Sequence, residues 1–295
     1  MSTSIDNAFV RQYERDVHDV FQRQGAVLLN AVRKQMSVVG TSTTFQKIGK
    51  GVATTKARHG LITPMNQDHT AIECTLADFY AGDYVDKLDQ AKTNIDEQGA
   101  LARGGAWALG RKVDEQITTV LDSTTQSTVS ITVTSSGATR AGLLSMVAAL
   151  HANDVPNDGE IYAALTPKAW AQAMTITAFA SADFVGPNGL PYVEGAPVGM
   201  WKPWMNVRWT MHTGLPGVGT GTAKVFAWHK SAVGYAAASA AGNIAGNAGV
   251  AADITWHGDR AAHFVNHMMS GGACLIDTTG VIEGNLDDTA AVASS

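Results

Sequence analysis

Residues 41 to 78 predict a β-hairpin that is too long to fold back onto its own domain. Two Thr-, Ile- and Phe-rich segments, 41–50 and 69–78, have the composition of strands, and Gly60 and Pro64 between them favour turns. At about 3.3 Å per residue the hairpin reaches on the order of 60 Å, whereas a compact chain of 295 residues has a radius of gyration of about 19 Å. An isolated two-stranded ribbon is only marginally stable in water. We therefore expect a neighbouring molecule to support the hairpin.

The charges in and around this hairpin are segregated by sign. Residues 20–67 contain seven Lys and Arg and no acid, whereas residues 68–97 contain eight Asp and Glu against two Lys. Two interpretations are open: two independently solvated faces, or complementarity between subunits. We favour complementarity. The residues predicted to meet at this subunit interface are Lys47, Lys50, Lys56 and Arg58 on the loop and Asp83, Asp86 and Asp89 on the neighbour.

The overall composition argues against several classes of protein. Charged residues make up only 16% of the chain, compared with about 25% in typical soluble proteins, so part of the surface is expected to be covered by other subunits. A net charge of −5 argues against a dedicated nucleic-acid-binding protein. No secretory signal and no run of 18 apolar residues occurs, so no membrane partner is predicted. Cys74 and Cys274 lack metal or redox spacing and are predicted to be free thiols.

Hydrophobic periodicity predicts an alternation of helices and strands. A helix is predicted over 98–122, where Arg111, Lys112, Asp114 and Glu115 should lie mostly on the polar face. Each glycine in a helix interior costs about 1 kcal/mol of stability relative to Ala, so close packing against a neighbour is the expected reason for the glycines here. They are Gly99, Gly104, Gly105 and Gly110. Two further helices are predicted, one over 5–35 and one that begins near Thr139. Another helix should begin at Thr166 and Pro167. Strands are predicted at 130–134, 161–165, 204–209, 224–229 and 252–257. Residues 181–199 should form a loop, 236–251 a weak helix or a loop, and 285–295 a mobile tail.

Four residues suggest a metal site, but their pattern is weak. His257, Asp259, His263 and His267 could supply zinc ligands, yet the sequence lacks the Glu of HExxH, and the flanking aromatic and β-branched residues favour a strand. The segment GVGTG at 217–221 lacks the Lys of a phosphate-binding loop and is predicted to be a turn. Trp201, Trp204 and Trp209 are expected in the core or an interface. We predict no enzymatic activity and no cofactor.

The order of these elements resembles the Hong Kong 97-type major capsid proteins of tailed bacteriophages. The segments that carry the resemblance are DFYAGDYVDKLDQAK, ALARGGAWALGRKVDEQITTVLD, LLSMVAALHANDVPNDGEIYAALTPKAW, VGMWKPWMNVRWTMHTGLPG and KVFAWHKSAVGYAAA. The resemblance implies an α+β fold. Its expected parts are an N-terminal arm (1–40), an extended β-hairpin loop (41–78), a peripheral domain with a long spine helix (79–129), an axial α/β domain (130–250), and return strands of the peripheral domain with a C-terminal tail (251–295).

The resemblance also implies a function in self-assembly. Hexamers and pentamers are expected to close into an icosahedral head around double-stranded DNA, which the subunits contact non-specifically. Portal, scaffold and decoration proteins are the other expected partners, and the location is the virion, assembled in the host cytoplasm. The sequence offers no match to the acceptor Asn or the carboxylate of a Lys crosslink, so none is predicted. Two alternatives remain: an encapsulin-like nanocompartment shell and a metal-dependent hydrolase.

Overall fold

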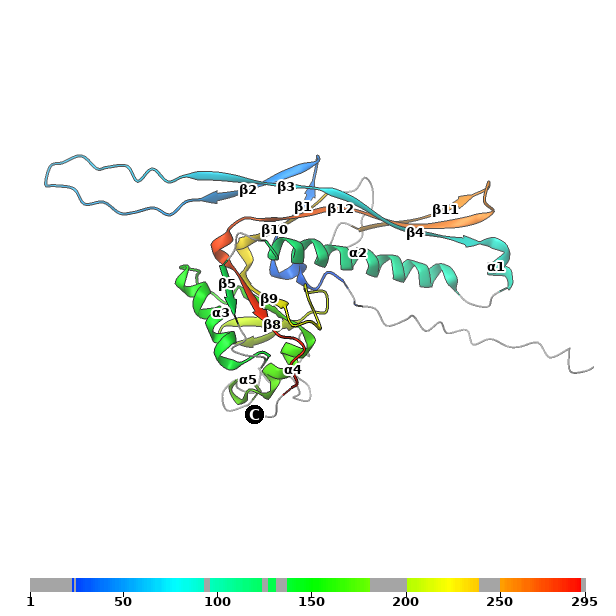
Figure 1. The fold of residues 1–295 in the computed structure, drawn as a ribbon. Coiled ribbons are helices and arrows are strands. Elements are labelled where there is room, and N and C mark those ends of the chain that lie inside the picture. Colours follow the sequence, from blue (N-terminus) through cyan, green and yellow to red (C-terminus); the bar gives the residue numbers. More distant parts are fainter. Residues whose placement is uncertain are drawn as a thin grey trace, which may run out of the picture.

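A long, thin layer lies over a compact lobe in this molecule (Figure 1). The computed structural model describes residues 23, 25–92, 96–123, 127–130, 137–180, 201–238 and 250–292. The layer contains a five-stranded sheet, a long helix and a projecting hairpin, and the lobe contains a six-stranded sheet with shorter helices. The described part of the chain is therefore a mixed α+β structure. Among these residues, none of the helices combines the length and hydrophobicity that a membrane span requires.

The five-stranded sheet is assembled from distant parts of the chain. Its strands are β1 (Arg33–Val38), β4 (Ala77–Asp86), β10 (Val233–Ala238), β11 (Val250–His257) and β12 (Ala262–Leu275). The order is β1-β10-β12-β11, and β4 pairs with β12. β12 is 14 residues long, which allows it to pair with β10 near its end and with β4 and β11 along its first part. β12 therefore pairs with three of the other four strands and holds this sheet together.

Helix α2 (Glu97–Leu121), which was predicted over 98–122, runs along one face of this sheet (Figure 1). Asp96 caps its first turn by accepting a hydrogen bond from the backbone N–H of Gly99. Glycines let the helix pack closely in two places: a Cβ on Gly105 would collide with the ring of His267 in β12, and one on Gly110 would lie 3.0 Å from the Cα of Gly25. The predicted close packing is confirmed for these two glycines. Gly104 has no such neighbour within 4 Å.

Two neighbouring glycines should therefore respond oppositely to the same substitution. Gly104→Ala should raise the free energy of unfolding of the unassembled protein by about 0.5–1 kcal/mol, because Ala favours helix and the added Cβ meets open space. Gly105→Ala should lower it by about 1–3 kcal/mol, because the added methyl overlaps the buried ring of His267. Urea denaturation of both variants checks this; equal shifts in the two would contradict the packing described.

The lobe is built on the six-stranded sheet, which is covered by helices (Figure 1). Its order is β5-β13-β9-β6-β8-β7, with bounds Ser127–Ser130, Val281–Leu286, Ala223–His229, Ile161–Leu165, Val207–Met211 and Lys202–Trp204. The helices are α3 (Arg140–Ala152), α4 (Pro167–Thr175) and α5 (Thr177–Ala180). Every residue of β6 is buried, which explains its uninterrupted apolar sequence. Thr139 and Thr166 cap α3 and α4, and Pro167 occupies the first turn of α4, as predicted.

The first predicted helix is wrong in the part that the structure describes. The chain forms a single 3-10 turn, η2 (Leu28–Ala31), and then strand β1, which pairs in parallel with β10. Leu28, Leu29 and Val32 are fully or almost fully buried, so the apolar periodicity reflects packing against the core and not helix. Residues 5–22 of that prediction lie outside the described residues, as does the predicted loop at 181–199.

The predicted mobile tail, 285–295, is wrong at its start, and its last three residues lie outside the described residues. Residues 281–286 form β13 inside the six-stranded sheet, and Asp288 is almost completely buried. Its carboxylate accepts hydrogen bonds from the hydroxyl of Thr166 (2.7 Å) and the backbone N–H of Gly219 (2.7 Å). These bonds fasten the end of the chain to α4 and to the turn at 217–221, which is the loop that the sequence predicted.

Three other sequence predictions have different outcomes. The segment 204–209 forms two strands, because Met205 and Asn206 turn the chain with positive φ values of 54° and 59°. The strand predicted at 130–134 is described only at Ser130, the last residue of β5. In the segment 236–251, residues 236–238 belong to β10, which is a strand and not the expected weak helix or loop.

Candidate functional site

The projecting hairpin has a paired stem and an unpaired distal loop. The stem strands β2 (Ser42–Ile48) and β3 (His69–Thr75) pair antiparallel over seven residues each, and the N–H of Gly49 donates to the carbonyl of Asp68 (2.7 Å). The two predicted strands and the hairpin are thus confirmed. The hairpin extends well beyond the lobe at one end of the molecule (Figure 1).

The stem contacts the body of the protein through a small apolar cluster. Phe45 and Cys74 are 2% and 1% exposed and pack with residues of β1, β10 and the end of β12. The cluster consists of Val38, Phe45, Cys74, Ala236, Cys274 and Ile276. A Cβ on Gly234 would lie 2.8 Å from the Phe45 ring, so glycine at this position lets the ring lie flat on β10. This cluster fixes the direction in which the hairpin leaves the body.

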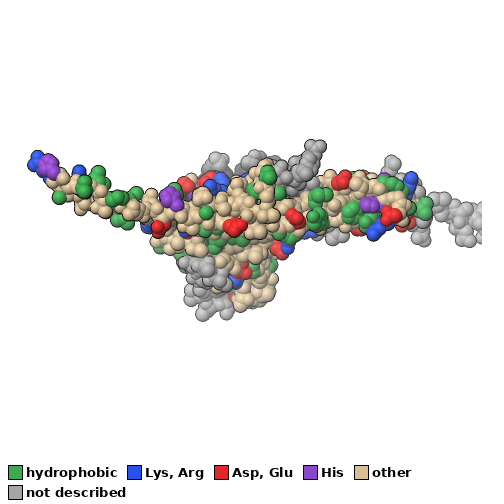
Figure 2. Space-filling view, turned by 90° about the horizontal axis from the view of Figure 1, so that it is seen from above, with side chains coloured by type: hydrophobic (Ala, Val, Ile, Leu, Met, Phe, Trp, Pro, Cys, Tyr) green, Lys and Arg blue, Asp and Glu red, His purple; other side chains and the backbone are tan. Residues whose placement is uncertain are grey.

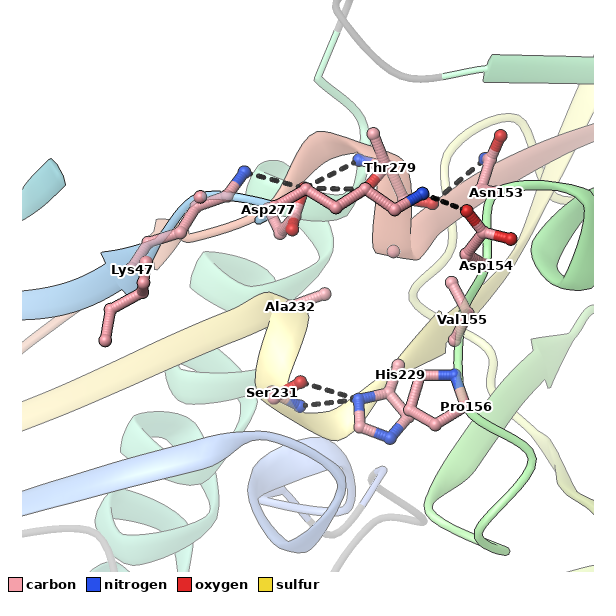
Figure 3. Close-up of a pocket in the computed structure, with 14 residues that line it drawn as sticks. Lys47, Asn153, Asp154, Val155, Pro156, His229, Ser231, Ala232, Asp277 and Thr279 are labelled. Carbon is pink, nitrogen blue, oxygen red and sulfur yellow. Dashed lines mark hydrogen bonds and ion pairs between the residues drawn. The ribbon is translucent and has the colours of Figure 1, made fainter. Parts of the chain in front are cut away.

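Two ion pairs brace the same stem beside a pocket of about 510 Å³ (Figure 3). The ammonium of Lys47 lies 2.9 Å from the carboxylate of Asp277, and Lys50 pairs with Asp154. Burial opposes the charge on Asp277, but hydrogen bonds from Lys47 and Thr279 outweigh it and hold the pKa of this carboxyl below its usual value. The side chains of the Lys47–Asp277 pair are about one-third exposed and those of the Lys50–Asp154 pair are mostly exposed, and exposed pairs contribute only about 0–1 kcal/mol.

These pairs change the interpretation of the basic loop residues. Lys47 and Lys50 were expected to face acids of a neighbouring subunit, whereas the single chain already provides Asp277 and Asp154 as partners. Asp154 and Asp277 lie far beyond the acidic segment 68–97 in the sequence, so the charge pattern alone could not identify them as the partners of Lys50 and Lys47. Lys56 and Arg58 lie at the tip of the loop, and within the described part of the chain no ion pair is formed by either.

The distal loop exposes apolar side chains that its own chain does not cover. Val52, Leu61, Ile62 and Met65 are 72%, 94%, 75% and 51% exposed. A tight turn, in which the N–H of Gly60 donates to the carbonyl of Ala57 (2.9 Å), reverses the chain at the tip. Basic and histidine side chains gather at this far end (Figure 2). Such a strip of exposed apolar groups marks an interaction surface.

The predicted acidic partners lie at the other end of the layer. Asp83 and Asp86 are exposed on β4, and Asp89 is exposed in the short helix α1 (Lys87–Lys92) that follows it. The carboxylate of Asp86 accepts a hydrogen bond from the N–H of Leu88 (2.7 Å) and so caps α1. Because the loop tip and α1 lie at opposite ends of the molecule, one chain cannot bring the two groups together (Figure 1).

Strand register separates these acids onto two faces of the sheet. His267 of β12 packs against Gly105 of α2, so Val265, two residues away, faces the same helix. Asp83 lies opposite Val265 and shares that face, whereas Asp86 points to the outer face. The acids on the outer face are Asp78, Asp86 and Asp253, and Asp253 of β11 lies outside the segment that the sequence analysis singled out.

The outer face also carries aromatic side chains. Tyr80 and Tyr84 are 70% and 39% exposed on β4, and the rings of Tyr84 and Phe264 lie 4.5 Å apart. Phe264 lies over Gly82, where a Cβ would approach its ring to 2.6 Å. Arg260 stacks on Tyr84 with its guanidinium carbon 4.6 Å from the ring centre. The outer face therefore combines flat aromatic surface with acidic side chains.

The suggested metal ligands are spread along two strands. His257 ends β11, where its Nδ1 lies 3.9 Å from Asp259; His263 packs on Trp256; and His267 is buried beneath α2. The predicted strand context is confirmed. Within the described segments, no group of three or more His, Cys, Asp or Glu side chains has the arrangement of a metal site. The predicted core role of Trp204 and Trp209 is confirmed, since both are buried beside Phe179.

One buried carboxyl group joins three parts of the chain. Asp114 of α2 is fully buried, although it was predicted on the polar face of the helix. It accepts hydrogen bonds from the N–H groups of Val27 (3.3 Å) and Leu28 (3.0 Å), and it lies 3.4 Å from Nε2 of His212. Its spacing of three and seven residues from the buried Ile117 and Leu121 is the signal that could have placed it on the buried face.

Several solved capsid structures share this fold over nearly their whole length. The capsid of cyanophage P-SCSP1u matches with a TM-score of 0.72 and 13% identity, over 97% of this chain and 95% of that one. The structure from Mycobacterium phage Che8 has a TM-score of 0.68 and 17% identity, covering 96% and 98%. The capsid of the native GTA particle has a TM-score of 0.69 and 12% identity, covering 97% of each chain. No sequence among curated proteins matches the chain.

The chain thus shares the fold of these proteins. The family model described as phage capsid protein matches residues 5–288, which is almost the entire sequence. The chain therefore belongs to the phage capsid protein family, and the predicted identity as a phage capsid protein is confirmed.

Proposed function

We propose that copies of this chain form the hexamers and pentamers of an icosahedral phage head that encloses double-stranded DNA. The observation that carries this proposal is the uncovered loop at one end of an elongated chain and the aromatic, acidic sheet face at the other. A contact between unlike surfaces of identical subunits propagates head to tail and closes into a ring when the rotation allows it. The family membership supports the same assembly.

We assign the parts of the chain to a Hong Kong 97-type architecture. The β2–β3 hairpin with its distal loop is the extended loop, α2 is the spine helix, the five-stranded sheet belongs to the peripheral domain, and the lobe is the axial domain. Four strands depart from the division expected from sequence. β1 lies within the expected arm (1–40) and β10 within the expected axial domain (130–250), yet both pair in the five-stranded sheet. β5 and β13 fall mostly or wholly within segments expected in the peripheral domain, yet both pair in the sheet of the lobe.

The role is structural and not enzymatic. The protein resides in the virion and assembles in the host cytoplasm, with portal, scaffold and decoration proteins as further partners. DNA contacts are non-specific, consistent with a net charge of −5. Negative-stain electron microscopy and light scattering of the purified chain test the proposal directly. Closed shells or ring-shaped capsomers are expected; a strictly monomeric mass at all protein and salt concentrations would refute it.

The basic tip of the loop is proposed to rest on the outer face of the neighbouring subunit. Lys56 and Arg58 would lie close to that subunit's outer-face acids, and Leu61 and Ile62 would cover its aromatic side chains. Charge pairing of exposed groups is weak, about 0–1 kcal/mol per pair, so its effect depends on repetition around the ring. It should also weaken as salt shortens the Debye length from about 10 Å at 0.1 M to about 3 Å at 1 M.

Reversal of the tip charges should therefore slow assembly without unfolding the subunit. The variant Lys56→Glu with Arg58→Glu should assemble more slowly than wild type at low salt, because two attractive contacts per interface become repulsive. Its circular dichroism should be unchanged, since both side chains are exposed. Time-resolved light scattering is the measurement.

Lys47→Glu provides the matched control. It reverses a charge that pairs within the chain, so it should affect the stem more than the contact between subunits. Restoration of the assembly rate by Asp86→Lys and Asp253→Lys in the tip variant supports the proposed contact. Wild-type assembly kinetics in the tip variant at low salt would count against it.

A further inference from the structure

The structure brings together two cysteines that are 200 residues apart in sequence. Cys74 lies in β3 of the hairpin stem and Cys274 in β12 of the body, and both belong to the six-residue cluster beneath the stem. The two thiols are close enough for each to change the pKa of the other. The side chains are 1% and 8% exposed, and both are free thiols. They link the hairpin stem to the five-stranded sheet.

We propose that Cys74 and Cys274 form an intramolecular disulfide under oxidising conditions, which locks the stem of the extended loop onto the five-stranded sheet. Both thiols lie in the same apolar layer and come from strands that pack directly against each other: a Cβ on Gly272 would collide with the backbone of Thr75. The Sγ of Cys274 would lie 3.1 Å from a Cβ on Gly234, so any side chain larger than glycine at that position would crowd the thiol.

The environment gives the two thiols different reactivity. The hydrogen bond from Cys274 lowers the pKa of the Cys74 thiol, and the same bond, together with burial, raises the pKa of Cys274. Cys74 is therefore the thiol that becomes a thiolate more readily and reacts first with an oxidant. It sits on the stem, which is a two-stranded sheet, and two-stranded ribbons are only marginally stable, so the stem is expected to open locally.

The chemistry requires a two-electron oxidant such as hydrogen peroxide. The Cys74 thiolate attacks a peroxide oxygen, the O–O bond breaks, and a sulfenic acid forms with release of hydroxide. When the stem closes again, the thiol of Cys274 attacks the sulfenic sulfur, the S–O bond breaks, and water leaves as the S–S bond forms. In total two thiols and one peroxide give one disulfide and two waters.

The stage at which the disulfide is expected to form rests on the proposed function. Thiols stay reduced in a cytoplasm, where assembly would occur, and oxidise outside the cell. The stem would then be free to adjust its angle during assembly and would be fixed afterwards in the released particle. The chemical proposal itself concerns the single chain and does not depend on assembly.

The test uses the full-length, reduced protein, treated with hydrogen peroxide in buffer and then denatured. The free thiol count should fall from two to zero, and peptide mapping should find one peptide that joins Cys74 to Cys274 within a chain. Amide exchange in the stem strands should slow by about tenfold or more, because opening is suppressed. Failure of shells to form would refute the proposed function but leave this result intact.

Single serine variants separate the disulfide from general oxidation. Cys74→Ser and Cys274→Ser each retain one thiol, and neither should show slower stem exchange after peroxide. The proposal is overturned if both thiols persist in wild type under conditions that oxidise them in the denatured chain. It is equally overturned if the crosslink forms only between chains, or if the crosslinked protein exchanges its stem amides as fast as the reduced form. The wild-type readouts stand even where a serine variant does not fold.

Discussion

Removal of the distal loop should abolish shell assembly while leaving the subunit folded. In the variant, residues 50–67 are replaced by Asn-Gly, a two-residue turn that joins Gly49 directly to Asp68 and suits the twist of a hairpin. The stem, its apolar cluster and all of the body remain. The deletion removes the four exposed apolar side chains, and burial of each such side chain on a neighbour contributes about 1.5–3 kcal/mol.

The expected loss per interface is therefore several kcal/mol, or more than about a thousandfold in association. Sedimentation velocity should find only unassembled subunits, with near-native circular dichroism. A second variant keeps the loop length and replaces Val52, Leu61, Ile62 and Met65 by Ser, which isolates the apolar contribution. Shells formed by the truncated protein at wild-type concentration would contradict a role of this loop in assembly.

Substitution of Asp114 should be strongly destabilising. Asp114→Ala removes the acceptor for two backbone N–H groups, of which that of Leu28 is buried and that of Val27 partly buried, and the partner of the buried His212. Buried polar groups that lose their partner keep the cost of desolvation, and breaking such a network typically costs about 3–5 kcal/mol. The same change detaches the start of the described chain from α2.

The matched control is Asp122→Ala, the same substitution at the end of the same helix. Asp122 pairs with Lys224 across 2.5 Å, but both side chains are about one-third exposed, so the loss should stay near or below about 1 kcal/mol. Differential scanning calorimetry should find a melting temperature roughly 6–10 °C lower for Asp114→Ala and only slightly lower for Asp122→Ala. Similar shifts for the two variants would show that Asp114 has no special role.

The sequence correctly predicted the helices and strands that are determined by residues close together in the chain. The hairpin strands, α2, and the Thr166 and Pro167 start of α4 were all found from periodicity and capping residues, because the side chains that decide them lie within a few residues of each other. The predicted helix over 5–35 ran into the start of strand β1, because the pairing partner of this strand, β10, lies some two hundred residues later in the sequence. Tertiary pairing overrides local periodicity there.

The sequence predicted the signs of the charges at the candidate interface but not which residues pair. The sequence placed basic residues in the loop and acids after it, yet it could not identify Asp277 and Asp154 as partners of Lys47 and Lys50. It also grouped Asp83 with Asp86, although an odd separation within one strand points two side chains to opposite faces. Asp114 was assigned to solvent by residue type, when its helical spacing from Ile117 and Leu121 indicated the core.

The path of the chain through the five-stranded sheet also has a consequence for biosynthesis. Arg33 lies opposite Gly234, and the cluster under the hairpin stem needs Cys274 and Ile276, so the stem is synthesised about two hundred residues before the strands on which it rests. Pairing between such distant segments is slow, and the nascent chain cannot complete the five-stranded sheet until residue 276 has left the ribosome. Until then the loop is not held in any fixed direction. Nascent subunits on a polysome should therefore not associate through the loop before that point.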